Sequence, residues 1–355
     1  MIHRLLLFPW PLLISAVAAA QSPVVERYVA IDNVCAWPAC TQLRDGTIVA
    51  TIFGKPSHGS MEGDAECWGS LDGKFWTKRG TPGPHEPGHN RMNLSAGLAS
   101  NGDLIVLPSG WSLKKSDSPT GWKVDVVQSP WICRSTDHGS TWAIDKSGFP
   151  KQPAGWSQFV PFGNIVSGAD GALRTACYSR DEQTKLDSVW MLRSADDGRT
   201  WAVQAKISSE NNETAILHLG NGKWLAAARS LKQTQQRLDS FRSDDDGQTW
   251  RFSEPLTEAA QHPAHLMRLK DGRILLSYGN RTKGKYGVLA KLSSDEGQSW
   301  SAPITLVDDL FSGDCGYPAS IERADGKIVT AYYSGGTAAH RRYHMGVVIW
   351  NLPGK

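Results

Sequence analysis

A short pattern that begins with serine and ends in tryptophan recurs through the chain, and it limits the possible folds more than any other feature. We call each copy a box; the five boxes are SLDGKFW from Ser70, STDHGSTW from Ser135, SADDGRTW from Ser194, SDDDGQTW from Ser243 and SSDEGQSW from Ser293, the first one residue shorter than the rest. The box aspartate can accept hydrogen bonds from backbone amides of a turn, the glycine tolerates an unusual backbone angle, and the tryptophan can pack inward. The boxes therefore predict structure and carry no information about chemistry.

Hairpin signals alternate strictly with the boxes. They are six pairs of the Asp-Gly or Asn-Gly type, flanked by apolar segments: Asp45-Gly46, Asn101-Gly102, Asp170-Gly171, Asn221-Gly222, Asp271-Gly272 and Asp325-Gly326. Such pairs accept the positive φ of a tight turn between antiparallel strands. Units of two hairpins commonly stack radially. The sequence thus predicts an all-β, six-bladed β-propeller whose last blade lacks a box and ends in the strand HMGVVIWNL.

Composition agrees with one large β domain. Hydrophobic residues make up 40% of the chain, 15 tryptophans supply core, and 35 glycines with 19 prolines indicate many turns. No shift in composition suggests a linker, so we expect a single domain over residues 21–355. The net charge of +3 is small and the basic residues are scattered. We therefore expect no nucleic-acid partner.

The first twenty residues are typical of a secretory signal peptide. A basic start is followed by an apolar stretch and by small residues placed for cleavage near Ala20. A membrane anchor is the alternative, but Pro9 and Pro11 interrupt the segment, which is also short for a span. No later segment is apolar enough to cross a bilayer. We expect residues 1–20 to be removed and the protein to be secreted or periplasmic, without a membrane partner.

The six cysteines are as compatible with disulfides as with buried free thiols. If they form disulfides, the sequence does not say which pair, because six cysteines can pair in about 15 ways. Their spacings match no metal site. A second ligand-like cluster, made of His58, Glu62, Asp64 and Glu66, also lacks a zinc spacing. We therefore predict no metal and no other cofactor.

The boxes and hairpins together resemble the Asp-box repeats of the sialidase superfamily, over nearly the whole of residues 21–355. The segment NETAILHLGNGKWLAAAR is similar to the fourth blade of sialidases and supplies Glu213 and Arg229. In the fifth and sixth blades, SYGNR offers Arg281 and DCGYPASIERADGKIVTAYY offers Tyr317. The resemblance implies that Glu213 is a general base, Tyr317 a nucleophile, and the two arginines ligands of a substrate carboxylate.

The chemistry of an acidic sugar explains these residue types. A sialic acid carries a carboxylate on its anomeric carbon and would repel a carboxylate nucleophile, whereas a neutral phenol paired with a glutamate base is not repelled. Arginine can hold the substrate carboxylate through a planar fork that lysine lacks.

The sequence departs from the sialidase pattern in two places. Where sialidases carry a first-strand arginine, this chain has CAWPAC with Ala36 at that position, so one of three arginines is missing; Arg91 is a candidate to replace it. The usual acid aspartate belongs to the loop after the first hairpin, where MEGDAE offers Glu62 or Asp64 as the proton donor.

Further polar and aromatic residues are expected at the same face because they lie at the starts and ends of the predicted strand pairs. We assign His58, Trp111 and Trp156 to substrate binding, with Trp37 as another surface on which a sugar can stack.

Three functions from different classes fit the sequence. The first is a secreted exo-glycosidase that hydrolyses a terminal sialic acid or related acidic sugar from glycans, and it would release a free reducing sugar. The second is a uronate lyase or another carbohydrate-active enzyme on the same propeller, and a lyase would give an unsaturated product that absorbs ultraviolet light. The third is a glycan-binding propeller without turnover. The sequence does not indicate an oligomeric state.

Overall fold

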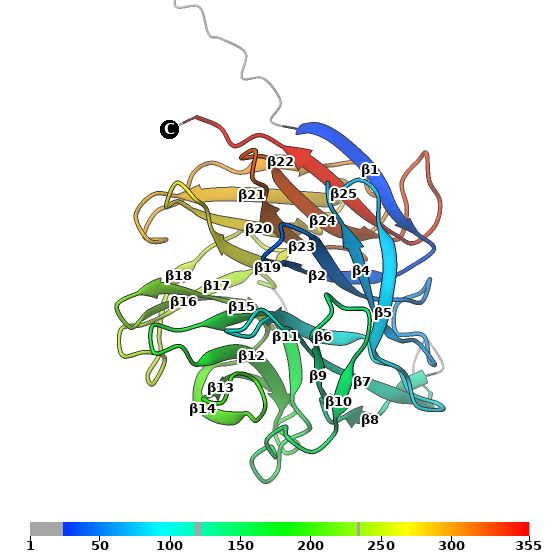
Figure 1. Ribbon diagram of the computed structural model, residues 1–355, viewed down its shortest axis with the longest axis vertical. Coiled ribbons are helices and arrows are strands. Elements are labelled where there is room, and N and C mark those ends of the chain that lie inside the picture. Colours follow the sequence, from blue (N-terminus) through cyan, green and yellow to red (C-terminus); the bar gives the residue numbers. More distant parts are fainter. Residues whose placement is uncertain (1–23, 118–121, 233–234, 355) are drawn as a thin grey trace, which may run out of the picture.

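The computed structural model describes residues 24–117, 122–232 and 235–354, and this part of the chain contains strands, turns and loops but no helix. The strands form antiparallel groups of four that follow one another along the chain and are arranged around a common centre (Figure 1). The predicted signal peptide lies outside the described residues.

Three sheets each contain four consecutive strands. They are β2 (Ala36–Gln42), β3 (Ile48–Phe53), β4 (Ala65–Ser70) and β5 (Thr77–Gly83); β15 (Asn211–Gly220), β16 (Lys223–Ser230), β17 (Leu238–Ser243) and β18 (Arg251–Pro255); and β19 (Gln261–Arg268), β20 (Ile274–Asn280), β21 (Gly287–Ser293) and β22 (Ile304–Val307).

A nine-stranded sheet joins two further groups, because β6 and β11 pair in parallel at Ser95 with Gly163 and at Ala96 with Asn164. Its strands are β6 (Asn93–Leu98), β7 (Leu104–Lys115), β8 (Trp122–Gln128), β9 (Ile132–Ser135), β10 (Ala143–Asp145), β11 (Val160–Ser167), β12 (Leu173–Arg180), β13 (Asp187–Ser194) and β14 (Ala202–Ser209). The long β7 pairs with β9 near its start and with β8 near its end.

The last sheet unites the two ends of the described chain. Its order is β1 (Val24–Asp32), β25 (His344–Trp350), β24 (Ile328–Ser334) and β23 (Cys315–Glu322). The expected final strand is confirmed as β25, but no sequence signal indicated that β1 would pair with it. The first strands of the groups contact one another in the order β2, β6, β11, β15, β19 and β23, and β23 contacts β2.

The boxes make the hydrogen bonds that their sequence predicts. In each box the aspartate carboxylate accepts a backbone N–H two to four residues later, and the serine hydroxyl oxygen accepts the N–H of the box glycine; the aspartates are Asp72, Asp137, Asp196, Asp245 and Asp295. These bonds fix the turn between the third and fourth strands of a group.

Strand register places the boxes and the predicted site at opposite ends of a sheet. Across β2, β3 and β4, Ala36 aligns with Phe53 and Phe53 with Ala65 at one end. At the other end Gln42 aligns with Ile48, and Ile48 with the box residue Ser70. The start of the first strand is therefore the end farther from the box, as expected from the sequence.

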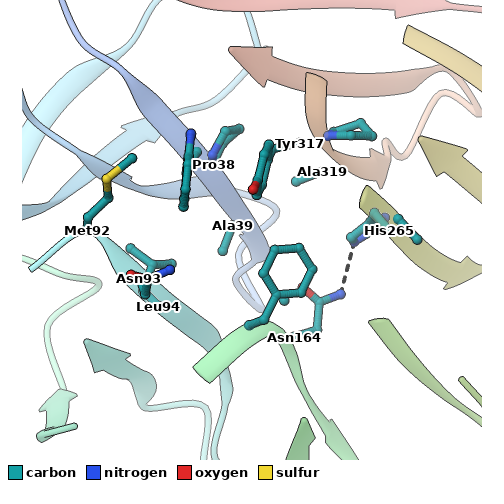
Figure 2. A pocket seen from close by; sticks show the side chains of 14 residues that line it. Pro38, Ala39, Met92, Asn93, Leu94, Asn164, His265, Tyr317 and Ala319 are labelled. Atoms are coloured by element: carbon teal, nitrogen blue, oxygen red, sulfur yellow. Dashed lines mark hydrogen bonds between the residues drawn. The ribbon is translucent and has the colours of Figure 1, made fainter. Parts of the chain in front are cut away.

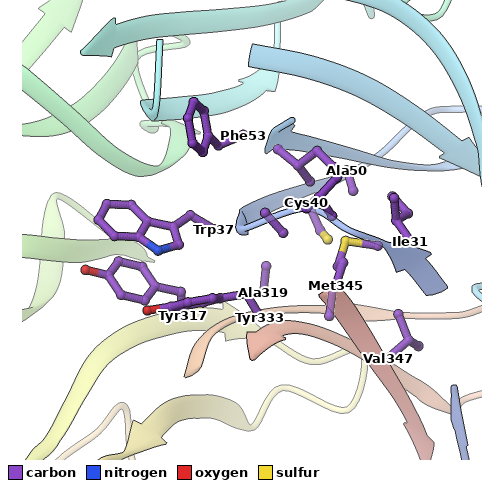
Figure 3. Packing of buried hydrophobic residues seen from close by; sticks show 14 of the residues in the cluster. Ile31, Trp37, Cys40, Ala50, Phe53, Tyr317, Ala319, Tyr333, Met345 and Val347 are labelled. Atoms are coloured by element: carbon purple, nitrogen blue, oxygen red, sulfur yellow. The ribbon is translucent and has the colours of Figure 1, made fainter. Parts of the chain in front are cut away.

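A buried cluster between β2, β3, β24 and β25 supports the site end. Figure 3 shows Trp37, Tyr317 and Tyr333 on one side of this cluster, with Phe53 and Met345 among its other members. The Trp37 ring stacks on the Tyr317 ring with centroids 4.4 Å apart and planes 10° apart. Packing in this cluster therefore fixes the positions of the aromatic rings that reach the site.

Candidate functional site

Irregularities in strand pairing mark the site end of four first strands. The register shifts between Ala36 and Ala39 in β2, between Asn212 and Thr214 in β15, between Gln261 and Ala264 in β19, and between Gly316 and Ala319 in β23. A β-bulge breaks the alternation of side chains and can turn one toward a new direction. The residues within these shifts include Trp37, Glu213, His262 and Tyr317.

Tyr317 and Glu213 form the centre of the site. The Tyr317 hydroxyl donates a hydrogen bond to Glu213 Oε1, although the residues lie on β23 and β15. Both side chains are buried, with exposed fractions of 6% for Tyr317 and 4% for Glu213. Burial, and then the charge of Glu213, raise the pKa of Tyr317 well above its ordinary value, despite the opposing effect of two nearby arginines. Tyr317 is therefore a neutral phenol at neutral pH, with a carboxylate in place to accept its proton.

Arg229 lies on the other oxygen of the same carboxylate. Its Nη1 donates to Glu213 Oε2 at 2.7 Å, and its Nη2 is 3.5 Å from Gln236 Oε1. Its buried Nε has no partner within the described structure. Burial lowers the pKa of Arg229, but the carboxylate of Glu213 outweighs it and the pKa is raised. Arg229 is a charged guanidinium that keeps part of its hydrogen-bonding capacity.

Arg281 approaches Tyr317 from β20. Its guanidinium carbon is 5.2 Å from the centroid of the Tyr317 ring, while Nε and Nη2 donate to the Cys315 carbonyl oxygen at 3.2 and 3.0 Å. The two strands come close because Gly279 faces Gly316; a Cβ on Gly316 would lie 2.8 Å from the Gly279 Cα. The structure thus brings together the four residues that the resemblance singled out.

A neutral histidine accompanies the two arginines. Burial, followed by the charges of Arg229 and Arg281, lowers the pKa of His262 to about 2. Its buried Nδ1 has no partner within the described residues. Like the Arg229 Nε, it is a polar group that folding leaves available beside the site.

Ala36, the residue at which the resemblance to sialidases implies an arginine, is followed by Trp37 at the start of β2. Ala36 and Trp37 have φ angles of 62° and 50°, and Tyr317 has one of 48°, all in a region that such residues rarely adopt. The neighbouring indole stacks on the Tyr317 phenol instead of placing a cation beside it. Tyr317 therefore has an aromatic ring on one face.

The two residues expected to supply the acid differ in their surroundings. The Asp64 carboxylate accepts the His85 backbone N–H at 2.8 Å and lies 2.7 Å from His85 Nδ1, so it is already engaged. Glu62 is exposed on the same loop, with a φ of 57°. His58 lies closer to the site, with its ring edge-on to Trp37 at 4.7 Å between centroids.

The other predicted binding residues lie in different settings. Arg91 is buried, donates to Glu86 Oε2 at 3.1 Å and to the Ser129 carbonyl, and stacks on Trp131 at 3.6 Å, while its buried Nε, like that of Arg229, has no partner within the described residues. Trp156 packs edge-on against Trp190 at 5.4 Å. Trp111 packs against the cluster that contains Trp37 and Tyr317, and therefore borders the site.

A cavity lies along the same first strands, beside Tyr317 and Trp37 (Figure 2). Its volume is small, about 30 Å³, and its lining includes Asn93, Asn164 and His265. Neither Glu213 nor the two arginines line it. Asn164 Nδ2 and His265 Nε2 are 3.0 Å apart at its wall. The cavity therefore continues from the aromatic rings toward the box end and is separate from the arginine side of the site.

Other classes of site have no counterpart in the described residues. No three histidine, cysteine, aspartate or glutamate side chains there are grouped to hold a metal ion, and the six cysteines are buried free thiols. Nor does any helix of the described part have the length and apolar character needed to cross a membrane.

Comparison with known proteins agrees with this geometry. The architecture is that of sialidase-superfamily proteins with BNR repeats: the microbial sialidase Hz136 from the Hadza aligns with a TM-score of 0.68, 16% identity and coverage of 89% of this chain and 65% of its own. Residues 46–330 match the BNR repeat-like domain. The chain belongs to this family.

Two further relatives show the range of the similarity. A Dyadobacter fermentans protein of unknown function aligns with a TM-score of 0.78, 22% identity and coverage of 93% of this chain and 99% of its own. A sialidase from Bacteroides fragilis is 25% identical over 190 residues, which are 50% of this chain and 34% of the relative. The matched segment thus spans about a third of that relative.

Proposed function

We propose that the chain is a six-bladed propeller glycosidase that hydrolyses a terminal sialic acid or a related acidic sugar from glycans after export. The ring of contacts among β2, β6, β11, β15, β19 and β23 supports the six blades, because each of these strands opens a group of four. The segment of residues 1–20 motivates the proposed export.

One observation carries the catalytic part of the proposal: the buried Tyr317 hydroxyl donates to a glutamate that an arginine also holds. A phenol becomes a nucleophile when a base takes its proton, and Glu213 is placed to do so. The phenol brings no charge of its own, so a substrate carboxylate can approach it. Arg229 and Arg281 then supply the positive charge that attracts this carboxylate.

The absence of an arginine at Ala36, together with the stacking of Trp37 on Tyr317, bears on the substrate. Two guanidinium groups remain to hold a carboxylate, and the indole offers an apolar face next to them. We propose that the acid group of the substrate binds between Arg229 and Arg281, and that apolar atoms of the sugar lie toward Trp37.

The test is to incubate the purified protein with a panel of glycans that end in sialic acids, ketodeoxy sugars or uronic acids, and to analyse the products by mass. Release of a free acidic sugar, heavier by one water than the residue in the glycan, is the expected result. An unsaturated product that absorbs ultraviolet light would replace hydrolysis by a lyase reaction. Binding without any product across the panel would leave a glycan-binding propeller instead.

A further inference from the structure

Three histidine–aspartate pairs lie among the described loops near the site end. They are His58 with Asp314 at 2.9 Å, His85 with Asp64 at 2.7 Å, and His340 with Asp32 at 2.7 Å. The first differs from the others in its neighbours: His58 lies edge-on against Trp37, and Trp37 stacks on Tyr317. This pair joins the loop after β3 to the residue just before β23.

Asp314 is held by more than the histidine. Its Oδ1 also accepts the Tyr333 hydroxyl and its Oδ2 accepts the Tyr343 hydroxyl. Burial would raise the pKa of Asp314, but the hydrogen bonds from His58, Tyr333 and Tyr343 outweigh burial and hold the pKa well below its ordinary value. Asp314 is therefore ionised throughout the neutral range, in an orientation fixed from three sides.

The other titratable groups facing Asp314 are neutral in that range. Burial is the largest cause that raises the pKa of Tyr333, Tyr343 and Cys35, and the charge of Asp314 raises each one further. Among the neighbours of Asp314, His58 is the one whose ring lies edge-on against Trp37.

The pairing also fixes which nitrogen of His58 is available. An ionised carboxylate only accepts hydrogen bonds, so Nδ1 of His58 carries the proton that points to Asp314. Nε2 lies on the opposite side of the ring, and the His58 side chain is 44% exposed. A carboxylate that orients an imidazole while its other nitrogen exchanges protons is the arrangement found in hydrolases that use histidine as acid and base.

We propose that His58 is the proton donor and acceptor of the glycosidase reaction, and that Asp314 is its positioning residue. The proposal rests on the proposed function, and it assigns the acid role to a histidine instead of to Glu62 or Asp64. Asp64 is bound to His85, and Glu62 is exposed without contact to the stack of aromatic rings among the described contacts. His58 is connected to that stack directly.

Each step balances. In the first, the Tyr317 oxygen bonds to the anomeric carbon while Glu213 takes the phenolic proton; the bond from that carbon to the leaving oxygen breaks, and this oxygen takes the proton from His58 Nε2. In the second, water attacks the same carbon and gives a proton to Nε2, while the Tyr317 oxygen leaves and recovers its proton from Glu213. One water is consumed, and an alcohol and a free sugar are released.

The experiment compares two leaving groups on the same sugar. The probes are N-acetylneuraminic acid linked to 4-nitrophenol, which leaves without help from an acid, and the same sugar linked to lactose, which requires protonation. For His58→Ala we expect kcat/KM on the lactose conjugate to fall by about 10²-fold or more. On the nitrophenyl conjugate we expect a fall of less than about 10-fold, because the acid contributes little there. Activity on the nitrophenyl conjugate also shows that the variant is folded.

His85→Ala is the matched control, since it removes the histidine of a similar pair on the same loops. It is expected to leave the ratio between the two probes unchanged. Equal losses of His58→Ala on both probes, or a selective loss in His85→Ala or Glu62→Gln, would overturn the assignment of His58. If the unmodified protein turns over neither probe, the proposed function fails for this sugar and the inference falls with it.

Asp314→Asn tests the positioning role separately. Loss of the negative charge removes the carboxylate that favours a protonated imidazole, so the alkaline limb of the pH profile for the lactose conjugate should move to lower pH. A purely structural aspartate would lower activity without moving this limb, and that result would remove Asp314 from the proposal.

Discussion

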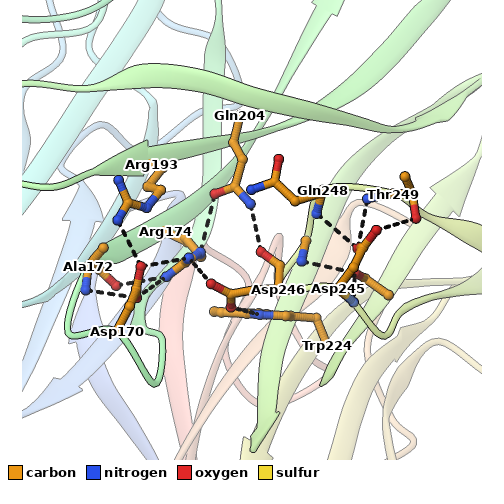
Figure 4. Close-up of polar contacts among 12 residues, drawn as sticks. Asp170, Ala172, Arg174, Arg193, Gln204, Trp224, Asp245, Asp246, Gln248 and Thr249 are labelled. Atoms are coloured by element: carbon orange, nitrogen blue, oxygen red, sulfur yellow. Dashed lines mark hydrogen bonds and ion pairs between the residues drawn. The ribbon is translucent and has the colours of Figure 1, made fainter. Parts of the chain in front are cut away.

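Two arginines at opposite ends of the sheets, Arg174 buried and Arg229 largely buried, show how structural and functional charges differ in this molecule. Arg174, near the boxes, donates to the Asp170 and Asp246 carboxylates, to the Ala172 carbonyl and to the Gln204 side chain, so that all three of its nitrogens are engaged (Figure 4). Arg229, at the site end, has one close partner, one distant partner and a buried Nε without any in the described structure.

The difference in satisfied donors separates a structural arginine from one that can bind a ligand. A buried guanidinium whose donors are satisfied stabilises the fold, and there is no donor left for a ligand. A buried donor without a partner costs free energy in the empty protein, and a ligand that accepts its hydrogen bond recovers that cost. Arginine therefore has a structural role near the boxes and a binding role at the site end, and the number of satisfied donors distinguishes the two roles.

The largest expected effect is the loss of activity when Tyr317, at the site end, is substituted. Tyr317→Phe removes the phenol oxygen but keeps the ring on Trp37, so kcat/KM should fall by about 10³-fold or more while the melting temperature changes little. Glu213→Gln should impair the same step. The double variant should be about as inactive as either single one, because the two residues act as a unit.

Tyr332→Phe is the control for this substitution. Tyr332 is also a fully buried tyrosine, and its hydroxyl accepts a hydrogen bond from Arg27 Nε at 2.8 Å. This variant should retain activity. Near-full activity of Tyr317→Phe would contradict the nucleophile assignment and move the chemistry to the His58 loop.

A matched pair of conservative substitutions gives the next largest effect. Arg174→Lys keeps the charge but cannot bridge Asp170, Asp246 and Gln204, so we expect a loss of about 1–3 kcal/mol in the free energy of unfolding, with kcat/KM unchanged. Arg229→Lys should cost less stability but raise KM by about 10-fold or more, because it removes the planar fork. Urea denaturation and steady-state kinetics on both variants measure the two quantities. A loss of stability in Arg229→Lys with unchanged KM would show that Arg229, too, stabilises the fold and does not bind substrate.

The fold was largely predictable because its determinants are local. A box and an Asp-Gly pair each fix a turn with residues that are close in sequence, and the turns fix the register of the strands between them. The pairing of β1 with β25 was not predictable in this way, because it depends on the two ends of the chain meeting and neither end carries a turn signal.

The site was predictable in part. Glu213 and Arg229 are neighbours on one hairpin, so their ion pair follows from local pairing. The partner of His58 lies in another segment, since Asp314 is 256 residues away, and Arg91 contacts Ser129, which is 38 residues away, as well as the nearby Glu86. One local signal was missed: Trp37, His262 and Tyr317 each precede Pro-Ala, and all three lie at a bulge. Proline interrupts regular pairing, so this repeated triplet pointed to the side chains that leave the strand pattern.

The smallest expected effect concerns how the free energy of unfolding changes with pH at the two ends of the sheets. At the box end, Asp196 and Asp295 have their pKa lowered to about 2; burial opposes the shift, strongly for Asp196, and hydrogen bonds within the box outweigh it. At the site end, burial lowers the pKa of His265 to about 4, and burial with the two arginines lowers that of His262 to about 2. In both cases the unfolded chain takes up protons at a higher pH than the folded chain. The histidines of the unfolded chain are protonated below pH 6.5, and its aspartates only below about pH 4.

Stability should therefore decline in two stages as the pH falls, the first caused by neutral histidines such as His262 and His265. Between pH 6.5 and 4 each buried neutral histidine contributes a loss of about 1 kcal/mol per pH unit, since the unfolded state gains a proton that the folded state excludes. His262→Gln should flatten this stage, and Asp196→Asn should change only the stage below about pH 4. Urea denaturation at a series of pH values gives both slopes. An unchanged slope between pH 6.5 and 4 in His262→Gln would mean that His262 takes up a proton in the folded protein; a charged His262 between Arg229 and Arg281 would then require an anion at the site even without substrate.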